Sequence, residues 1–219
     1  MQVRGERADE VAAHDAVPAL FGARHRRADA RRNEEKLVEA ARKVFAKCGS
    51  DASMEAIARE AGVGVGTLYR HFPKRVDVVE ALYRSDVDVL VAAADDALAS
   101  SDAWQGLAGW LEAYVRYSVN KKILLAELQE AFAKNPQLKL DSRERIVAAL
   151  SRVLGRAQDA GVARLDVNAD DLMGLLWSLC PNTAEPQTYR LLAVVLDGLA
   201  TARRPNTGTT SDGITPGLA

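Results

Sequence analysis

The sequence predicts an all-α protein of about nine helices, arranged as a small N-terminal three-helix domain and a larger C-terminal helical domain. Apolar residues recur at intervals of three and four along most of the chain, as they do on the buried face of a helix. Alanine, leucine and valine are plentiful, whereas aromatic residues make up only 5% of the 219 residues. Glycine and proline fall mostly between the periodic segments, where they end helices.

The composition is that of an ordinary globular protein, with 48% apolar and 27% charged residues. No stretch approaches the run of about 18 apolar residues that spans a membrane, and no signal peptide is visible at the N-terminus. We therefore expect a cytoplasmic protein with no membrane attachment. The sequence contains no motif for nucleophilic catalysis, phosphate loops or zinc binding, so we expect no catalytic site, no metal site and no cofactor.

The net charge of −1 conceals a separation of charge along the chain. Residues 22–75 hold 13 lysines and arginines against 7 acidic residues, a net charge of +6, whereas residues 76–219 carry a net charge of −5. A basic segment on an otherwise acidic protein is typical of a module that binds nucleic-acid phosphates.

Residues 1–30 show no sustained periodicity, and we expect them to form a disordered basic arm. The arginines at its end are Arg24, Arg26, Arg27, Arg31 and Arg32. Such an arm can lie along DNA phosphates or enter a minor groove, and a solvated tail explains the same residues equally well. The apolar spacing then predicts a helix from about Asn33 to Cys48.

Two short helices joined by a tight turn are predicted within residues 53–75. Ser53 is a suitable N-cap, because its hydroxyl can accept a hydrogen bond from an amide of the first turn. Gly62 can close this helix in a left-handed conformation. A second helix is expected over about residues 64–71. Two short helices with a glycine-containing turn are typical of a helix-turn-helix.

The second of these helices has an outward face that packing alone does not explain. Leu68 and Phe72, one turn apart, are expected to face inward. The outward residues are Gly64, Gly66, Thr67, Tyr69, Arg70 and His71. A glycine lowers helix stability by about 1 kcal/mol relative to alanine, so a helix with only a structural role would gain from alanine there. The pattern indicates a recognition helix that lies in a DNA major groove.

The stretch AIAREAGVGVGTLYRHFPKR, residues 56–75, resembles the DNA-binding domain of the TetR (tetracycline-repressor-like) family of bacterial regulators. The resemblance covers about residues 31–80 and is most specific over GVGVGTLYRHF. Gly64 departs from the family, which often has a serine or another polar residue there, and Ser53 stands where threonine is commoner. The resemblance implies that residues 31–75 form a helix-turn-helix domain that binds double-stranded DNA.

The residues expected to contact DNA are Ser53, Gly64, Gly66, Thr67, Tyr69, Arg70, His71, Lys74 and Arg75. Thr67 and Arg70 are the candidates for contacts with bases, whereas Tyr69 and His71 should mainly contact the DNA backbone. Arg75 matches a family position whose basic residue commonly contacts that backbone.

Residues 76–204 are expected to form the ligand-binding and dimerisation domain, and the glycine-, threonine- and proline-rich residues 205–219 a disordered tail. A long helix without glycine or proline is predicted over about residues 75–99. Further helices are expected after Asp102 and over about residues 122–133, 141–160, 168–180 and 186–204.

The last two of these helices predict a homodimer. The helix over 186–204 is apolar nearly all round, so it must be covered on more than one side. The expected interface residues are Leu172, Leu175, Leu176, Leu179, Leu192, Val195, Leu196 and Leu199. A two-fold four-helix interface would imply a roughly palindromic operator. Burial of the helix within a single chain is the alternative.

An apolar ligand cavity is expected between the helices over 75–99 and 168–180. Its candidate lining residues are Trp110, Tyr114, Tyr117, Leu128, Phe132, Met173 and Trp177. These residues could also simply pack the core, which for any single one of them is the more common role. No charged cluster belongs to the set, so an uncharged or weakly polar ligand is favoured.

These features together indicate a sequence-specific DNA-binding transcriptional regulator. As the family resemblance implies, it would be a dimeric repressor that a small apolar ligand releases from its operator. One alternative is a DNA-binding regulator without a small-molecule ligand, controlled by its abundance or by a protein partner. The other is a helical enzyme with an attached helix-turn-helix, for which only Tyr114, Tyr117 and Glu127 offer catalytic groups.

Overall fold

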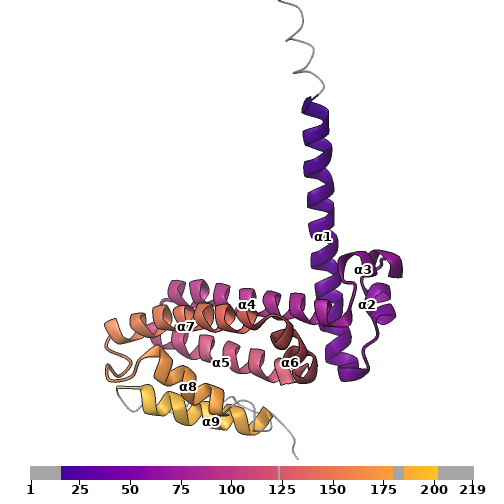
Figure 1. Cartoon of the computed structure of the whole chain (residues 1–219). Coiled ribbons are helices and arrows are strands. Elements are labelled where there is room, and N and C mark those ends of the chain that lie inside the picture. Colours follow the sequence, from indigo (N-terminus) through magenta and orange to yellow (C-terminus); the bar gives the residue numbers. More distant parts are fainter. Residues whose placement is uncertain (1–15, 123, 180–184, 202–219) are drawn as a thin grey trace, which may run out of the picture. The chain divides into compact units, whose positions relative to one another are not determined.

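The computed structural model describes residues 16–122, 124–179 and 185–201 (Figure 1). These residues form nine α-helices, one short 3-10 helix and no β-strand, which confirms the all-α prediction. None of the described helices is both long enough and apolar enough to cross a membrane. By its contacts the chain divides into two compact units, residues 1–89 with 120–142 and residues 90–119 with 143–219.

The first unit contains α1 (Ala16–Cys48), the 3-10 helix η1 (Gly49–Asp51), α2 (Met54–Glu60), α3 (Val65–His71) and α6 (Leu125–Lys134). The second unit contains α8 (Ala169–Leu179) and α9 (Glu185–Leu199). Three helices contribute residues to both units: α4 (Arg75–Ala99), α5 (Ala103–Lys122) and α7 (Pro136–Asp159). The compact units therefore divide inside these helices and not at residue 75, where we expected the domains to meet.

Helix α1 begins at Ala16, much earlier than the predicted start near Asn33. The prediction of a disordered arm is therefore wrong for residues 16–30, whereas residues 1–15 lie outside the described part of the chain. Alanine and arginine dominate residues 23–32, and both have high helix propensity. Pro18 falls in the first turn, where its missing N–H removes no helical hydrogen bond. Apolar periodicity does not detect a helix of this composition.

The helix-turn-helix forms as the sequence predicts. The Ser53 hydroxyl accepts a hydrogen bond from the Ala56 amide at 3.1 Å, which confirms the N-cap of α2. Gly62 has a φ of +68°, the left-handed conformation expected at the end of that helix. Helix α3 starts at Val65, with Gly64 as its N-cap. Figure 1 shows α2 and α3 beside the C-terminal half of α1, whose buried residues include Leu37.

In the second unit, α4 and α5 approach each other closely. A Cβ atom on Gly106 would lie 2.3 Å from the carbonyl oxygen of Ala97, so only glycine fits at this point. The indole Nε1 of Trp110 donates to the Leu90 carbonyl at 3.1 Å. Arg156 of α7 donates to the same Ala97 carbonyl at 2.9 Å. The C-terminal part of α4 is thus held by both α5 and α7.

Two predicted helix ends differ from the structure. Helix α7 starts at Pro136 and not near residue 141, because proline is well suited to the first helical position, where no N–H is needed. Helix α9 ends at Leu199, before the predicted end by Arg204. The chain there bonds to the α7–α8 connection: the Arg164 amide donates to the Leu199 carbonyl at 2.9 Å. The predicted tail over 205–219 lies outside the described residues.

Candidate DNA-binding surface

Helix α3 has one buried and one exposed face. Leu68 is fully buried and Phe72 is 5% exposed, so these two side chains anchor the helix as predicted. On the opposite side, Gly66 and Arg70 are exposed, and the Tyr69 side chain is 42% exposed. The structure therefore brings these three predicted residues together on one accessible surface.

Four other predicted residues lie at the edges of this surface. Thr67 and His71 are half-buried and flank the exposed face of α3. Gly64 is exposed at the N-terminus of α3, and Ser53 is exposed at the N-terminus of α2, where its hydroxyl caps the helix.

Lys74 and Arg75 differ in their surroundings. Lys74 is exposed, and its backbone amide donates to the Asp77 carboxylate at 2.9 Å. Arg75 instead points into its own unit, where its guanidinium group donates to the carbonyls of Ser50 and Ala52 and to the Glu127 carboxylate. To contact DNA as the resemblance implies, Arg75 would have to leave these partners.

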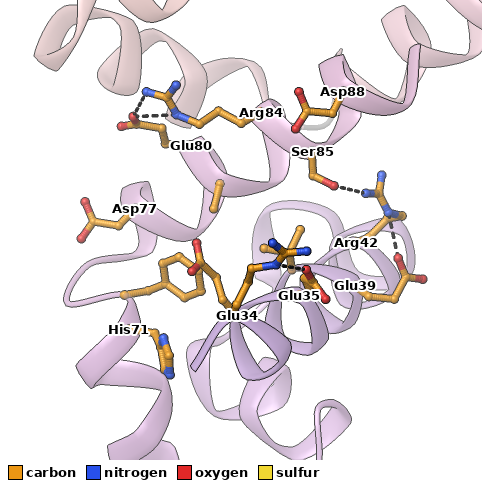
Figure 2. Close-up of a pocket in the computed structure, with 14 residues that line it drawn as sticks. Glu34, Glu35, Glu39, Arg42, His71, Asp77, Glu80, Arg84, Ser85 and Asp88 are labelled. Atoms are coloured by element: carbon orange, nitrogen blue, oxygen red, sulfur yellow. Dashed lines mark hydrogen bonds and ion pairs between the residues drawn. The ribbon is translucent and has the colours of Figure 1, made fainter. Parts of the chain in front are cut away.

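A groove of about 750 Å³ runs along α1, the end of α3 and α4 in the first unit (Figure 2). Six carboxylates and three guanidinium groups line it, and Figure 2 shows His71 at its edge. Arg84 bonds to Glu80 at 2.7 Å within the groove, and Arg42 bonds to Ser85 at 3.2 Å. The excess of carboxylates repels phosphate, so the groove disfavours DNA on this side of α3.

Arg42 joins α1 to α4 at this groove, because its guanidinium group also pairs with the carboxylate of Asp86. Burial raises the pKa of the Asp86 carboxyl, and the hydrogen bond and charge of Arg42 oppose that rise. This ion pair fixes α4 against the helix that supports α2 and α3.

The candidate ligand-pocket residues are divided between the two units. Leu128 and Phe132 belong to the first unit, where Phe132 meets Tyr83 edge-on, with ring centroids 5.2 Å apart. The others belong to the second unit: Trp110, Tyr114, Tyr117, Met173 and Trp177.

Within the second unit, three aromatic rings of α5 form a row in which each ring contacts the next. The Trp110 and Tyr114 rings stack with centroids 6.2 Å apart, and Tyr117 follows at 6.1 Å from Tyr114. Met173 is buried, but Trp177 is 36% exposed and lies under the guanidinium group of Arg143. Trp177 is therefore less suited to line an enclosed cavity than the sequence suggested.

Most of the candidate dimer-interface leucines and valines are already covered by their own chain. The buried ones are Leu172, Leu176, Leu192, Val195 and Leu199. Leu196 is half-buried, Leu175 is 48% exposed, and the side chain of Leu179 lies outside the described residues. Val194, which we did not include, is 67% exposed on α9. The accessible apolar surface of α8 and α9 is thus smaller than predicted, and on α9 it includes Val194, the residue before the predicted Val195.

Sequence reasoning also passed over Val65, the first residue of α3, whose side chain is 39% exposed. The signal was present in the sequence, because Val65 lies four residues before Tyr69 and so shares its outward face. The spacing alone was ambiguous, because Val65 also lies three residues before the buried Leu68.

A short exposed helix, held by a capped helix and a glycine turn, is the geometry of the helix-turn-helix class of DNA-binding proteins. The comparisons with known proteins agree. A family model described as "Bacterial regulatory proteins, tetR family" matches residues 37–82. A second, described as "Transcriptional regulator SbtR-like, C-terminal domain", matches residues 102–201.

Solved structures match most of the chain. The TetR transcriptional regulator SCO0520 from Streptomyces coelicolor is 36% identical, with a TM-score of 0.68, over 77% of this chain and 99% of that one. A TetR regulatory protein from Mycobacterium vanbaalenii is 31% identical, with a TM-score of 0.62, over 80% and 98% of the two chains. The chain belongs to the TetR family of bacterial transcriptional regulators.

Curated relatives match over a shorter stretch. An HTH-type transcriptional regulator of Staphylococcus aureus is 39% identical over 66 residues, which cover 30% of this chain. The match spans only 36% of the length of that relative, so it supports the DNA-binding class alone.

Proposed function

We propose that this chain is a dimeric transcriptional repressor that binds a roughly palindromic double-stranded DNA operator and leaves it when a small apolar ligand binds. The exposed face of α3, with Gly66, Tyr69 and Arg70 opposite the buried Leu68, carries the DNA-binding part of this proposal. Such a face fits a major groove, which admits one α-helix.

The side chains on α3 suggest separate roles in DNA recognition. Arg70 is exposed and can donate two hydrogen bonds to a guanine edge, the commonest specific contact of arginine. Tyr69 can donate its hydroxyl to a phosphate, which positions the protein without reading sequence. Thr67 is the second candidate for a base contact, and Lys74 and Ser53 are candidates for phosphate contacts.

The dimer is proposed to form through the exposed sides of α8 and α9. Leu175 and Val194 expose 48% and 67% of their surface, and Gly174 and Gly198 are exposed beside them. Small residues next to apolar ones allow two helices to approach closely. A two-fold dimer would place two recognition helices on successive major grooves, about 34–36 Å apart.

The ligand is proposed to bind in the second unit, beside the aromatic residues of α5. Trp110, Tyr114 and Met173 are buried there, and Tyr117 is half-buried. A ligand that binds better to one arrangement of α4 would shift the population toward it. Weakening DNA affinity a hundredfold requires only about 2.7 kcal/mol of coupling free energy.

The proposal is tested with purified full-length protein. Duplexes selected from a random DNA library define an operator, and mass spectrometry after incubation with a metabolite extract identifies any captured compound. The captured compound must lower operator affinity, and operator DNA must lower the affinity for the compound by the same factor. If the protein enriched no duplex from the library, the DNA-binding proposal would be contradicted.

A regulator without a small-molecule ligand is the second candidate, and burial of the aromatic residues as plain core favours it. In that case a captured compound would leave operator affinity unchanged. The enzyme alternative has less support, because TetR-family regulators are non-enzymatic DNA-binding proteins. A turnover assay on the captured compound tests it.

A further inference from the structure

Val65 is an apolar side chain presented outward at the start of the recognition helix. It is the first residue of α3 and is 39% exposed, close to the 42% of Tyr69 one turn later. The two side chains therefore share the face that is proposed to enter the major groove. Leu68, the other branched aliphatic residue of α3, is fully buried.

The surroundings of Val65 leave it open to a partner. Gly64 and Gly66 flank it, and a Cβ atom at either glycine would meet no other atom within 4 Å. No neighbouring side chain of α3 therefore shields Val65 on these two sides. The glycines also let the backbone come close to a surface, which a short side chain such as valine requires for contact.

The fold does not require a valine at this position. Valine is a weaker helix former than alanine because its branched side chain loses rotamer freedom, and a side chain that is 39% exposed gains less from burial than a core valine does. In the major groove, the one apolar group on the base edges of unmodified DNA is the C5-methyl of thymine. Valine offers two stiff methyl groups that match it, and no polar atom that a G·C edge could bond.

We propose that Val65 contacts a thymine methyl group and so specifies a T·A pair at one position of each operator half-site. The inference rests on the proposed DNA binding and adds to it a specificity-determining residue. It assigns Val65 an apolar contact, whereas Arg70 supplies hydrogen bonds to bases.

The test uses full-length protein and the consensus duplex that the wild type selects from a random library. Each thymine of one half-site is replaced in turn by deoxyuridine, which removes only the methyl group, and affinity is measured by fluorescence anisotropy. For the wild type, one replacement should weaken binding about fourfold, as expected for one methyl group removed from a contact. For Val65→Ala, binding to the thymine duplex should weaken about as much, and that same replacement should cause no further loss.

The matched control is Val89→Ala, which removes the same atoms from a valine that is 64% exposed on α4. It should retain the wild-type response to every deoxyuridine. Thermal unfolding checks that Val65→Ala folds, which alanine should favour.

The inference is overturned if no thymine in the half-site responds, or if Val65→Ala keeps the wild-type response at every thymine. These outcomes leave the proposed DNA binding intact. Failure of the wild type to select any duplex would overturn both.

Discussion

The guanidinium group of Arg75 lies against the carboxylate of Glu127, with Nη2 3.0 Å from Oε1, and both side chains are largely buried. Arg75 also stands over the Phe45 ring at 4.8 Å and donates to the Ser50 carbonyl at 3.1 Å. One side chain at the start of α4 therefore joins α1, η1 and α6 within the first unit. This places Arg75 as a support of the helix-turn-helix.

Removing this support should lower stability without removing a phosphate contact. We expect Glu127→Gln and Arg75→Ala each to reduce the free energy of unfolding by about 1–3 kcal/mol, because each leaves a hydrogen-bonded charge without its partner. Chemical denaturation measures this change. Asp95→Asn, which breaks the exposed pair of Asp95 with Arg152, is the control and should change little.

The salt dependence of DNA binding separates the two interpretations of Arg75. An internal support leaves the slope of log affinity against log salt unchanged in Arg75→Ala. A phosphate contact, as the family resemblance implies, lowers the slope by about 1. A lowered slope together with unchanged stability would contradict the role that we give to Arg75.

Gly66→Ala should increase stability and weaken DNA binding. Gly66 lies inside α3, and a Cβ atom there would meet no other atom within 4 Å, so alanine should stabilise the helix by about 1 kcal/mol. The added methyl group would hold the backbone away from DNA and reduce operator affinity. Gly109→Ala, at an equally open glycine of α5, should stabilise the protein and leave operator affinity unchanged. Equal operator affinity in both variants would show that α3 does not approach DNA at Gly66.

Lys121 should make stability depend on pH. Burial, reinforced by the nearby charge of Lys139, lowers the pKa of Lys121 to about 8, and its ammonium group lies 5.2 Å from the centre of the Tyr83 ring. Between pH 8 and about 10.5 the unfolded chain keeps a proton that the folded chain has released, so stability rises with pH in this window.

The variant Lys121→Met removes this titration. The free energy of unfolding of the wild type, measured relative to that variant, should therefore increase from pH 8 to about pH 10.5. Lys36→Met, which removes an exposed lysine of α1, is the control for the loss of a positive charge and is measured in the same way. If the difference in free energy of unfolding between the wild type and Lys121→Met stayed constant over this pH range, burial would not lower the pKa of Lys121 as described.

Charges on the exposed apolar residues of α8 and α9 should prevent dimerisation. Leu175→Asp and Val194→Asp leave each folded chain intact, because both positions are exposed in the single chain. In a dimer the new carboxylate would be buried without a partner, which costs several kcal/mol and should weaken association about a hundredfold or more. Sedimentation equilibrium measures this.

Leu165→Asp, at a leucine that is 80% exposed between α7 and α8, is the matched control for these variants and should remain dimeric. A wild type that sediments only as a monomer at micromolar concentration would exclude the dimer. Variants that dimerise like the wild type would place the interface elsewhere.

The elements with local signals could be predicted from the sequence. Ser53 and Gly62 mark the ends of α2 through capping chemistry, and both have the predicted geometry. The start of α1 could not be found in this way, because a segment rich in alanine and arginine has helix propensity but no apolar stripe. The spacing of apolar residues predicted which segments are helical. The N-terminal extent of α1 depended instead on its alanine- and arginine-rich composition.

The candidate site was harder to predict, because exposure depends on tertiary contacts. The sequence could not show that the carboxylate of Glu127, 52 residues away, accepts a hydrogen bond from the guanidinium group of Arg75. It also could not show that the chain itself covers Leu172 and Leu192. The spacing of Val65 to Tyr69 pointed outward, but its spacing to the buried Leu68 pointed inward, so its exposure followed only from the structure.

The most direct test of DNA docking is the affinity of the double variant Tyr69→Ala/Arg70→Ala for the duplex that the wild type selects. Removing a base contact from Arg70 should cost about 1–3 kcal/mol, and removing a phosphate contact from Tyr69 should weaken all sequences alike. We therefore predict a loss of tenfold or more by fluorescence anisotropy. Glu34→Gln/Glu35→Gln in the acidic groove is the control, and should bind at least as tightly as the wild type. Unchanged affinity of Tyr69→Ala/Arg70→Ala would contradict docking through the exposed face of α3.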